Sequence, residues 1–344
     1  MINFRFHLVS LVAVFLALAL GVVMGSTVID RAIVDRLSTQ IDSVKKRADA
    51  ERADNRALRD QVKGLEAFVA QSQPQVTARR LNQVPVTMVA VRGIPAEDVK
   101  GEADALRSAG ALVSGVLWIE DSFGAADPGT RARLVQAMGD SGLATEDLRQ
   151  VALEALGHRL AAGPRLIAAS TVTGSTVTGS TAGSTAPETG LDTLVALADA
   201  GLVTFDTMGG GAVSLESWPS PGSRLLVIDG SQAHPPPGTL TIPVLRAAAA
   251  AGGRLALAEV FRPTATIKAR GAVVRGVRED AALSRVVSTV DDLDDPRGQV
   301  ALTLAIQELG TGRAGHYGEG PGASSQLPTL ESAPPDGVPA AAGR

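Results

Sequence analysis

A run of 22 uncharged, mostly apolar residues near the amino terminus constrains this chain more than any other feature. It covers residues 8–29, LVSLVAVFLALALGVVMGSTVI. As an α-helix it would span about 33 Å, close to the thickness of a bilayer core. The alternative is a cleaved signal peptide, whose apolar part is usually about 7–15 residues and ends in an A-x-A-like site. No A-x-A site stands between the apolar run and a polar stretch, so the sequence predicts a retained transmembrane helix at residues 8–29, after a short segment at 1–7.

The charges around this segment do not decide which way the chain crosses the membrane. One basic residue, Arg5, precedes it, and five follow closely: Arg31, Arg36, Lys45, Lys46 and Arg47. A count of basic residues would place the following side in the cytoplasm. Acidic residues are interleaved with these bases, however, and long domains are translocated largely regardless of charge. Charge alone leaves both orientations open.

A heptad pattern occupies residues 30–73. The a positions are Val34, Ile41, Ala48, Asn55, Val62 and Val69, and the d positions are Leu37, Val44, Glu51, Leu58, Leu65 and Ser72. Nine of these twelve positions are apolar, which is typical of a coiled coil. Because asparagine at a favours a parallel dimer in fixed register, we predict a parallel homodimer joined by the apolar positions and Asn55. The alternative is a helix folded back on the chain's own domain. Pro74 is expected to end the helix.

Alternating strand and helix patterns in residues 84–310 predict an α/β domain. Residues 86–91, 97–109 and 111–119 read as strand, helix and strand, a unit that indicates parallel strands. Further helices are expected at 128–138, 146–160, 191–200, 242–251 and 296–309, and further strands at 166–169, 202–206, 224–228, 254–260, 272–277 and 286–290. We expect a three-layer α/β domain with a mostly parallel sheet.

Two segments are expected to stay outside this domain's core. Residues 170–187 contain tandem STVTG repeats and read as a flexible low-complexity insertion. Residues 311–344 are rich in Gly, Pro, Ser and Ala and read as a disordered tail.

Composition excludes several function classes. The chain has no cysteine, which removes disulfides, thiolate metal sites and cysteine nucleophiles. Its net charge of −4 gives no reason to expect nucleic acid as a partner.

Three local patterns are candidate chemical sites. Asp229 ends a buried-looking strand, where α/β sheets often place functional groups, and His234 follows in a proline-rich loop. No nucleophile motif accompanies them, so a turn aspartate and a surface histidine are the simpler interpretation. Residues 209–211 are GGG after a strand, but no phosphate-binding spacing follows, which favours a tight turn.

The third pattern is the acidic cluster at residues 291–295, DDLDD. Hard cations prefer such oxygens, but the spacing is not that of a calcium loop. Asp295 is instead expected to cap a helix that begins at Pro296, with the other carboxylates near the positive helix end.

Local spacing shows no soft-metal site. The histidines are His7, His158, His234 and His316, and the methionines are Met1, Met24, Met88, Met138 and Met208. None of them forms a close pair of the kind that binds soft metals. The sequence thus predicts no catalytic or cofactor residue and leaves the metal ligands unknown.

The order of several motifs resembles a known family. NFRFH at residues 3–7 runs into LALALGVVMGS at residues 16–26 and then into the heptads. Residues 288–292 are STVDD, followed by the expected helix from Pro296, and residues 315–318 are GHYG. Together these features resemble the actinobacterial MctB family, also called the SteB or copper-transporter family. The resemblance covers the chain apart from the repeat and the tail.

The resemblance implies an envelope protein whose α/β domain faces outward. It implies copper export or copper homeostasis, with a proposed outer-membrane channel role. Copper is therefore implied by the resemblance alone. It also implies a cell-separation complex with a membrane partner, SteA.

The residues favour the role in a cell-separation complex over the outer-membrane channel role. An outer-membrane channel needs many alternating strands of about 10 residues, whereas this sequence has one apolar helix and α/β patterning. We therefore expect a non-enzymatic, dimeric coiled-coil scaffold for an envelope complex at the cell membrane. Direct copper export and a hydrolase-like or nucleotide-binding enzyme are the alternatives.

Overall fold

The computed structural model describes residues 4–125, 127–139, 142–163 and 192–329, without the side chains of residues 26–33. The chain divides into two compact units, Met1–Leu65 and Glu66–Arg344. The STVTG insertion, the strand expected at 166–169 and residues 330–344 of the expected tail lie outside the described residues.

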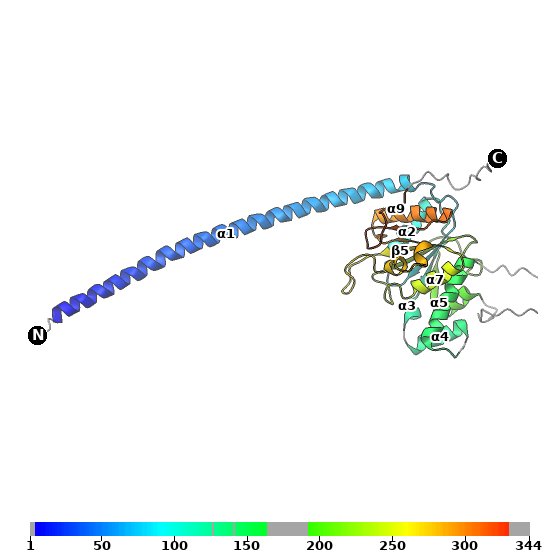
Figure 1. Cartoon of the computed structure of the whole chain (residues 1–344), viewed down its shortest axis with the longest axis horizontal. Coiled ribbons are helices and arrows are strands. Elements are labelled where there is room, and N and C mark those ends of the chain that lie inside the picture. Colours follow the sequence, from blue (N-terminus) through cyan, green and yellow to red (C-terminus); the bar gives the residue numbers. More distant parts are fainter. Residues whose placement is uncertain (1–3, 126, 140–141, 164–191, 330–344) are drawn as a thin grey trace, which may run out of the picture. The chain divides into compact units, whose positions relative to one another are not determined.

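Helix α1 (Phe4–Thr77) is a single helix of 74 residues (Figure 1). Its first part, the 22 residues Phe4–Gly25, contains an 18-residue stretch with a mean hydropathy of 2.7. Within the described part of the chain, this is the helix whose length and composition suit a membrane span. The apolar segment Phe4–Gly25 begins and ends four residues earlier than the transmembrane helix predicted at residues 8–29. Its retention as an anchor stays a prediction.

The expectation that Pro74 ends α1 is wrong, because the helix continues to Thr77. A proline removes one backbone donor, but contacts around it can hold a further turn. The Thr77 hydroxyl donates to the Gln73 carbonyl at 2.8 Å. The Gln73 side chain donates to the Gln299 side chain at 3.2 Å, a bond within the second unit that holds this last turn to α9.

Within the described residues, seven strands form one sheet in the order β3-β2-β1-β4-β5-β6-β7. They are β1 (Val86–Val91), β2 (Val116–Ile119), β3 (Val203–Asp206), β4 (Arg224–Gly230), β5 (Arg254–Val260), β6 (Val287–Val290) and β7 (His316–Tyr317). Neighbouring strands are parallel except β2 and β3, so the sheet is mixed but mostly parallel. Every residue of β1, β2, β4 and β6 is buried, as in sheets that are covered on both faces.

Two groups of helices pack in this unit. The described helices after α1 are α2 (Ala96–Ser108), α3 (Asp121–Gly124), α4 (Pro128–Met138), α5 (Thr145–Ala162), α6 (Thr193–Asp199), α7 (Thr241–Ala250), α8 (Arg275–Arg278) and α9 (Pro296–Glu308), with 3-10 turns η1 (Leu283–Arg285) and η2 (Leu309–Thr311). Helix α5 packs against α7 and α4, whereas α2 packs against α9 (Figure 1). The α/β class is confirmed, and the three-layer arrangement stays a prediction.

Two expectations about the carboxyl-terminal part are wrong. The strand expected at 272–277 is absent: residues 272–274 form a turn, and residues 275–277 belong to α8. Residues 311–329 are not a disordered tail, because they contain the end of η2 and strand β7. The Ser325 backbone also bridges to Tyr317. Both segments pack against buried carboxylates, as described next.

Candidate functional site: the carboxyl ends of β4, β5 and β6

Three neighbouring parallel strands end in buried carboxylates. Asp229 and Glu259 are the penultimate residues of β4 and β5, and Asp291 directly follows β6. Each of these residues is at most 1% exposed. Because carboxyl ends of parallel strands meet at the edge where α/β sheets bind ligands, this edge is the first candidate site.

Asp229 organises the loop between β4 and α7. Its carboxylate accepts from the Gly230 N–H at 2.7 Å, the Gly238 N–H at 2.9 Å and the Thr241 hydroxyl at 2.7 Å. Burial raises the pKa of Asp229, although these three donors act in the opposite direction. The carboxylate is therefore committed to folding the loop, which agrees with the simpler interpretation from the sequence.

Glu259 explains why the strand expected at 272–277 does not form. Its carboxylate accepts from four successive backbone N–H groups, those of residues 271–274, at 2.9–3.3 Å. The chain wraps around this carboxylate, so these N–H groups are not available to a sheet. Burial raises the pKa of Glu259, and the four N–H donors oppose this effect.

Asp291 forms a buried ion pair with Arg278. Arg278 Nη1 lies 2.8 Å from Asp291 Oδ2, and both side chains are at most 3% exposed. Asp291 also accepts from the N–H groups of Glu319 and Gly320 at 2.8–3.1 Å. Arg278 in turn donates to the Tyr317 carbonyl at 2.8 Å. The pair therefore fastens the segment after β7 to the end of β6.

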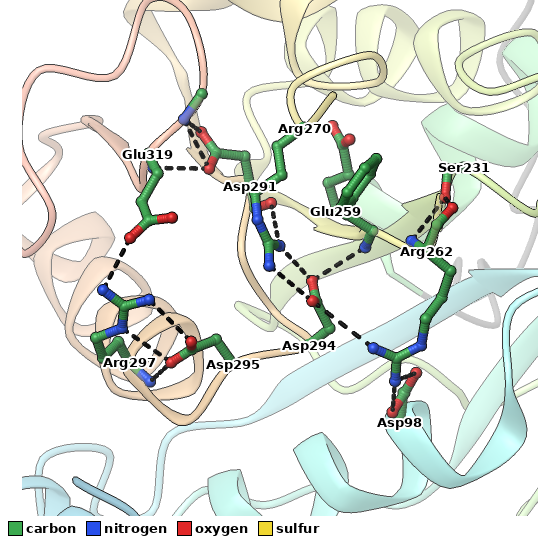
Figure 2. A network of polar contacts seen from close by, with 12 residues as sticks. Asp98, Ser231, Glu259, Arg262, Arg270, Asp291, Asp294, Asp295, Arg297 and Glu319 are labelled. Carbon is green, nitrogen blue, oxygen red and sulfur yellow. Dashed lines mark hydrogen bonds and ion pairs between the residues drawn. The ribbon is translucent and has the colours of Figure 1, made fainter. Parts of the chain in front are cut away.

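Asp294 joins the two ends of the loop that follows β5 (Figure 2). It accepts from the Phe261 N–H at 3.1 Å and from both terminal nitrogens of Arg270 at 2.5 and 2.9 Å. Arg262 lies 3.7 Å from the same carboxylate and also pairs with Asp98 at 3.0 Å. This carboxylate thus connects three segments that are distant in sequence.

Asp295 caps α9, as the sequence predicted. Its side chain accepts from the Arg297 N–H at 2.9 Å, and Pro296 is the first helical residue. Hydrogen bonds from the Arg297 side chain lower the pKa of Asp295. Asp291 and Asp294 of the same cluster bind arginines of other segments.

Asp292 differs from its neighbours. It is 3% exposed, and its Oδ1 is buried without a hydrogen-bond partner among the described residues. Burial raises its pKa to about 6, and the charge of Asp291 adds to this effect. A carboxyl group with such a pKa is poised to change protonation near neutrality, which is a property often found at functional sites.

Most of the oxygens at this edge are nevertheless occupied by the protein's own donors. Among the described residues, no group of three or more histidine or carboxylate side chains is arranged to hold a metal ion. The arrangement therefore performs structural work, since it closes loops and fixes the carboxyl-terminal segment.

The crevice between β1 and β4, where the strand order reverses, is filled by backbone. The His234 N–H donates to the Arg92 carbonyl at 3.1 Å. A Cβ atom at Gly93, whose φ is +92°, would lie 2.2 Å from the Gln232 carbonyl oxygen. The His234 side chain is exposed, and the structure joins it to Asp229 by no hydrogen bond among the described residues. A catalytic pair at this position is therefore not assembled.

The glycines at 209–211 line a shallow depression with Arg107 and Met208. The Arg107 guanidinium donates to the Val113 carbonyl at 3.2–3.3 Å and pairs with Asp104 at 3.1 Å. The Arg107 guanidinium is thus bound by a carbonyl and a carboxylate of the protein itself. This agrees with the tight turn that the sequence predicted at residues 209–211.

The heptad face of α1 is the second candidate site. Seven of its large apolar side chains are 51–63% exposed: Val34, Leu37, Ile41, Val44, Leu58, Val62 and Leu65. Soluble proteins rarely leave contiguous apolar surface uncovered, so such a row indicates an interaction surface. Asn55 is exposed on the same helix, whereas Ala48 and Val69 are half-buried.

Comparison with known proteins decides the family. A family model described as "Copper transport outer membrane protein, MctB" matches residues 1–328. The chain belongs to the MctB family. Relatives named "Copper transporter MctB" from Mycobacterium tuberculosis and Mycobacterium bovis are 26% identical over 342 residues. One from Mycobacterium leprae is 27% identical over 328 residues. Each alignment covers 94% of this chain and 98% of the relative.

The two carboxyl-terminal motifs that carried the MctB resemblance interlock in space. The Thr289 hydroxyl lies 3.0 Å from His316 Nδ1, and Asp291 binds the residues after β7. Gly318 has a φ of +120°, and a Cβ there would lie 2.3 Å from Asp291 Oδ1. STVDD and GHYG are therefore two halves of one packed junction.

Sequence reasoning missed three residues that hold this junction and the loops beside it. Glu259, Arg270 and Arg278 stand in segments read as ordinary strands or turns. A charged residue within the apolar strand run LALAEV was the available signal for Glu259. Nothing local identifies Arg278, because its partners are 11 to 43 residues away.

Proposed function

We propose that this chain is a membrane-anchored, non-enzymatic envelope protein that dimerises through α1 and organises a protein complex. The observation that carries the proposal is the exposed heptad face that follows the apolar segment of the same helix. Burying one Val, Leu or Ile side chain contributes about 1.5–3 kcal/mol, so seven such side chains provide a strong drive for association. A second chain anchored in the same membrane presents the same face in the same direction.

The proposal includes a location and a class of partner. The α/β domain lies outside the cytoplasm, and the complex serves the cell envelope. A membrane protein resembling SteA is the candidate partner. Support for these points comes from the resemblance described above, together with the family description as an outer-membrane copper-transport protein.

Substitution of two seam residues tests the proposal. We expect Leu58→Arg combined with Leu65→Arg to abolish dimerisation and partner capture, because two desolvated layers of the coiled coil would receive charges. Asp60→Arg is the matched control, since residue 60 lies outside the a and d positions. The measurement is crosslinking in native membranes, followed by co-purification and mass spectrometry. Assembly that persists in the double variant would refute the scaffold.

Copper transport is the second candidate function, because the matched relatives are named copper transporters. The described residues place His316 against Thr289 and Met88 in the buried strand β1, so neither is a free soft ligand. Copper binding measured on the purified full chain, together with the copper tolerance of a deletion strain, separates the two functions. Stoichiometric binding and copper sensitivity would favour transport over the scaffold.

A further inference from the structure

The heptad face of α1 has a polar centre. Glu51 at d and Asn55 at a stand between two apolar stretches, at residues 34–48 and 58–65. Both side chains are exposed, and the Asn55 amide donates to the Glu51 carbonyl at 2.9 Å within the helix. The Glu51 carboxylate is therefore presented on the face that a partner helix would cover.

The charges that flank this centre depend on the direction of pairing. In an antiparallel pair of two copies, e positions face e positions and g positions face g positions. Pairing Glu51 with Asn55 in that arrangement would bring Arg52 opposite Arg52 and Lys45 opposite Arg59. It would also place Asp54 opposite Asp54. All three contacts oppose like charges.

A parallel pair replaces these contacts with attractive ones. Each g position then faces the next e position of the second copy, so Asp54 meets Arg59. Each d position adjoins the e position of the second copy, so Glu51 meets Arg52. Arg47 faces Arg52 as a like charge, but Glu51 lies one turn from Arg47 in its own helix and offsets that repulsion.

The parallel arrangement also has two Glu51 side chains facing each other at d. The two Arg52 guanidinium groups lie beside them, one from each copy, so the four charges alternate. Arg52 itself is free to rearrange, since its pairing with Asp49 at 3.2 Å involves side chains that are 73% and 57% exposed. Exposed pairs of this kind contribute little stability.

The paired segment ends before the helix does. Gln73, one turn after Val69, binds Gln299 within the second unit, and Thr77 is 2% exposed. That face of the last turns is therefore occupied by the chain's own domain. Leu65, which is 60% exposed, is the last exposed apolar residue at the a and d positions.

We infer that residues 34–65 of α1 pair with the same residues of a second copy, parallel and in register, and that Glu51 and Arg52 of the two copies form a ring of four charges that selects this register. The inference rests on the dimer proposed above. It adds the charged residues that favour the parallel direction and select the register of pairing.

Cysteine crosslinking of the full chain in native membranes tests the direction. The chain has no cysteine of its own, so Val62→Cys supplies a single thiol. Parallel pairing places residue 62 opposite residue 62, and diamide should then give a disulfide-linked dimer. Antiparallel pairing places residue 62 opposite residue 44. A crosslink between differently tagged Val62→Cys and Val44→Cys chains, without the 62–62 crosslink, would overturn the inference.

Charge reversal tests the ring in the Val62→Cys background. We expect Glu51→Arg or Arg52→Glu alone to weaken the dimer by roughly tenfold, because each brings four like charges together. The double variant should restore crosslinking, because the alternation of charges returns. Arg56→Glu is the matched control and should have no effect, since residue 56 is a b position.

The outcomes separate the ring from the dimer. Absence of any dimer in the unsubstituted background refutes both this inference and the scaffold proposed above. A 62–62 crosslink that neither single reversal weakens, or that the double variant fails to restore, overturns the ring and leaves the dimer standing.

Discussion

At the scale of single residues, Asp292 is the least satisfied group of the acidic cluster. Its neighbours Asp291, Asp294 and Asp295 each bind an arginine, whereas Asp292 Oδ1 has no hydrogen-bond partner among the described residues. Burial and the adjacent Asp291 charge raise its pKa from 3.8 to about 6. Between about pH 4 and 6, the Asp292 carboxyl therefore keeps its proton in the folded chain and loses it in the unfolded chain.

This raised pKa predicts a pH-dependent effect of Asp292→Asn. The folded state binds more protons than the unfolded state between about pH 4 and 6, so the contribution of Asp292 to the free energy of unfolding falls across that window. We expect the variant to be more stable than the original chain above pH 6, by about 1–3 kcal/mol, because it carries no ionised carboxylate. Below pH 4 the two should coincide.

Urea unfolding of both chains at several pH values measures this difference. Asp199→Asn provides the control, because Asp199 is exposed at the end of α6. A constant difference between the Asp292→Asn variant and the original chain at all pH values would contradict the prediction.

At the scale of elements, the junction between β6 and β7 holds the carboxyl-terminal segment. Arg278 comes from α8, its partner Asp291 follows β6, and the residues bound to both follow β7. Three short elements that are weak alone are thereby joined through one buried ion pair. Breaking such a pair is costly because the remaining charge has no compensation.

We therefore predict that Arg278→Met destabilises the α/β domain by about 3–5 kcal/mol. The amides of Glu319 and Gly320 should lose hydrogen-exchange protection more than those of β4, because Asp291 would no longer be oriented toward them. Exchange measured by mass spectrometry and urea unfolding check both statements.

Two further variants test whether the lost charge or the lost packing of Arg278 causes the destabilisation. Arg275→Met, in the same short helix but exposed, should have little effect. Combining Arg278→Met with Asp291→Asn should cost less than Arg278→Met alone, because no buried charge is left unpaired. Equal costs would show that the arginine acts through packing and not through charge.

Elements also show where sequence reasoning succeeds. The strands at Val86–Val91 and Arg254–Val260 and the helix at Pro128–Met138 have the bounds that their patterns predicted. Apolar runs and a proline at the first helical position are local signals. The segment at 272–277 has the composition of a strand, but Glu259 draws its N–H groups away, which no local pattern reveals.

At the scale of the whole molecule, the apolar part of α1 is the segment that we expect to anchor the chain in a membrane. If residues 4–25 are retained, the protein resists extraction with alkaline carbonate, and its intact mass includes these residues. We expect both results, because the apolar segment is longer than a signal-peptide core and no A-x-A site stands between it and a polar stretch. A mature amino terminus located after residue 25 would contradict the prediction.

A truncation provides the control for that experiment. A chain without residues 2–29 should partition into the soluble fraction, with the circular dichroism of a folded α/β domain, because the second unit is compact. Membrane association that survives the truncation would assign the attachment to another part of the chain.

The apolar helix, the heptad face, the α/β class and the MctB family can be predicted without a structure, because each depends on periodicity or on motifs read along the chain. Tertiary structure alone decided that the acidic cluster is divided among Arg270, Arg278 and the α9 cap. It also decided that residues 315–320 belong to the domain. Buried charges find their partners across space, at separations for which a linear pattern carries no signal.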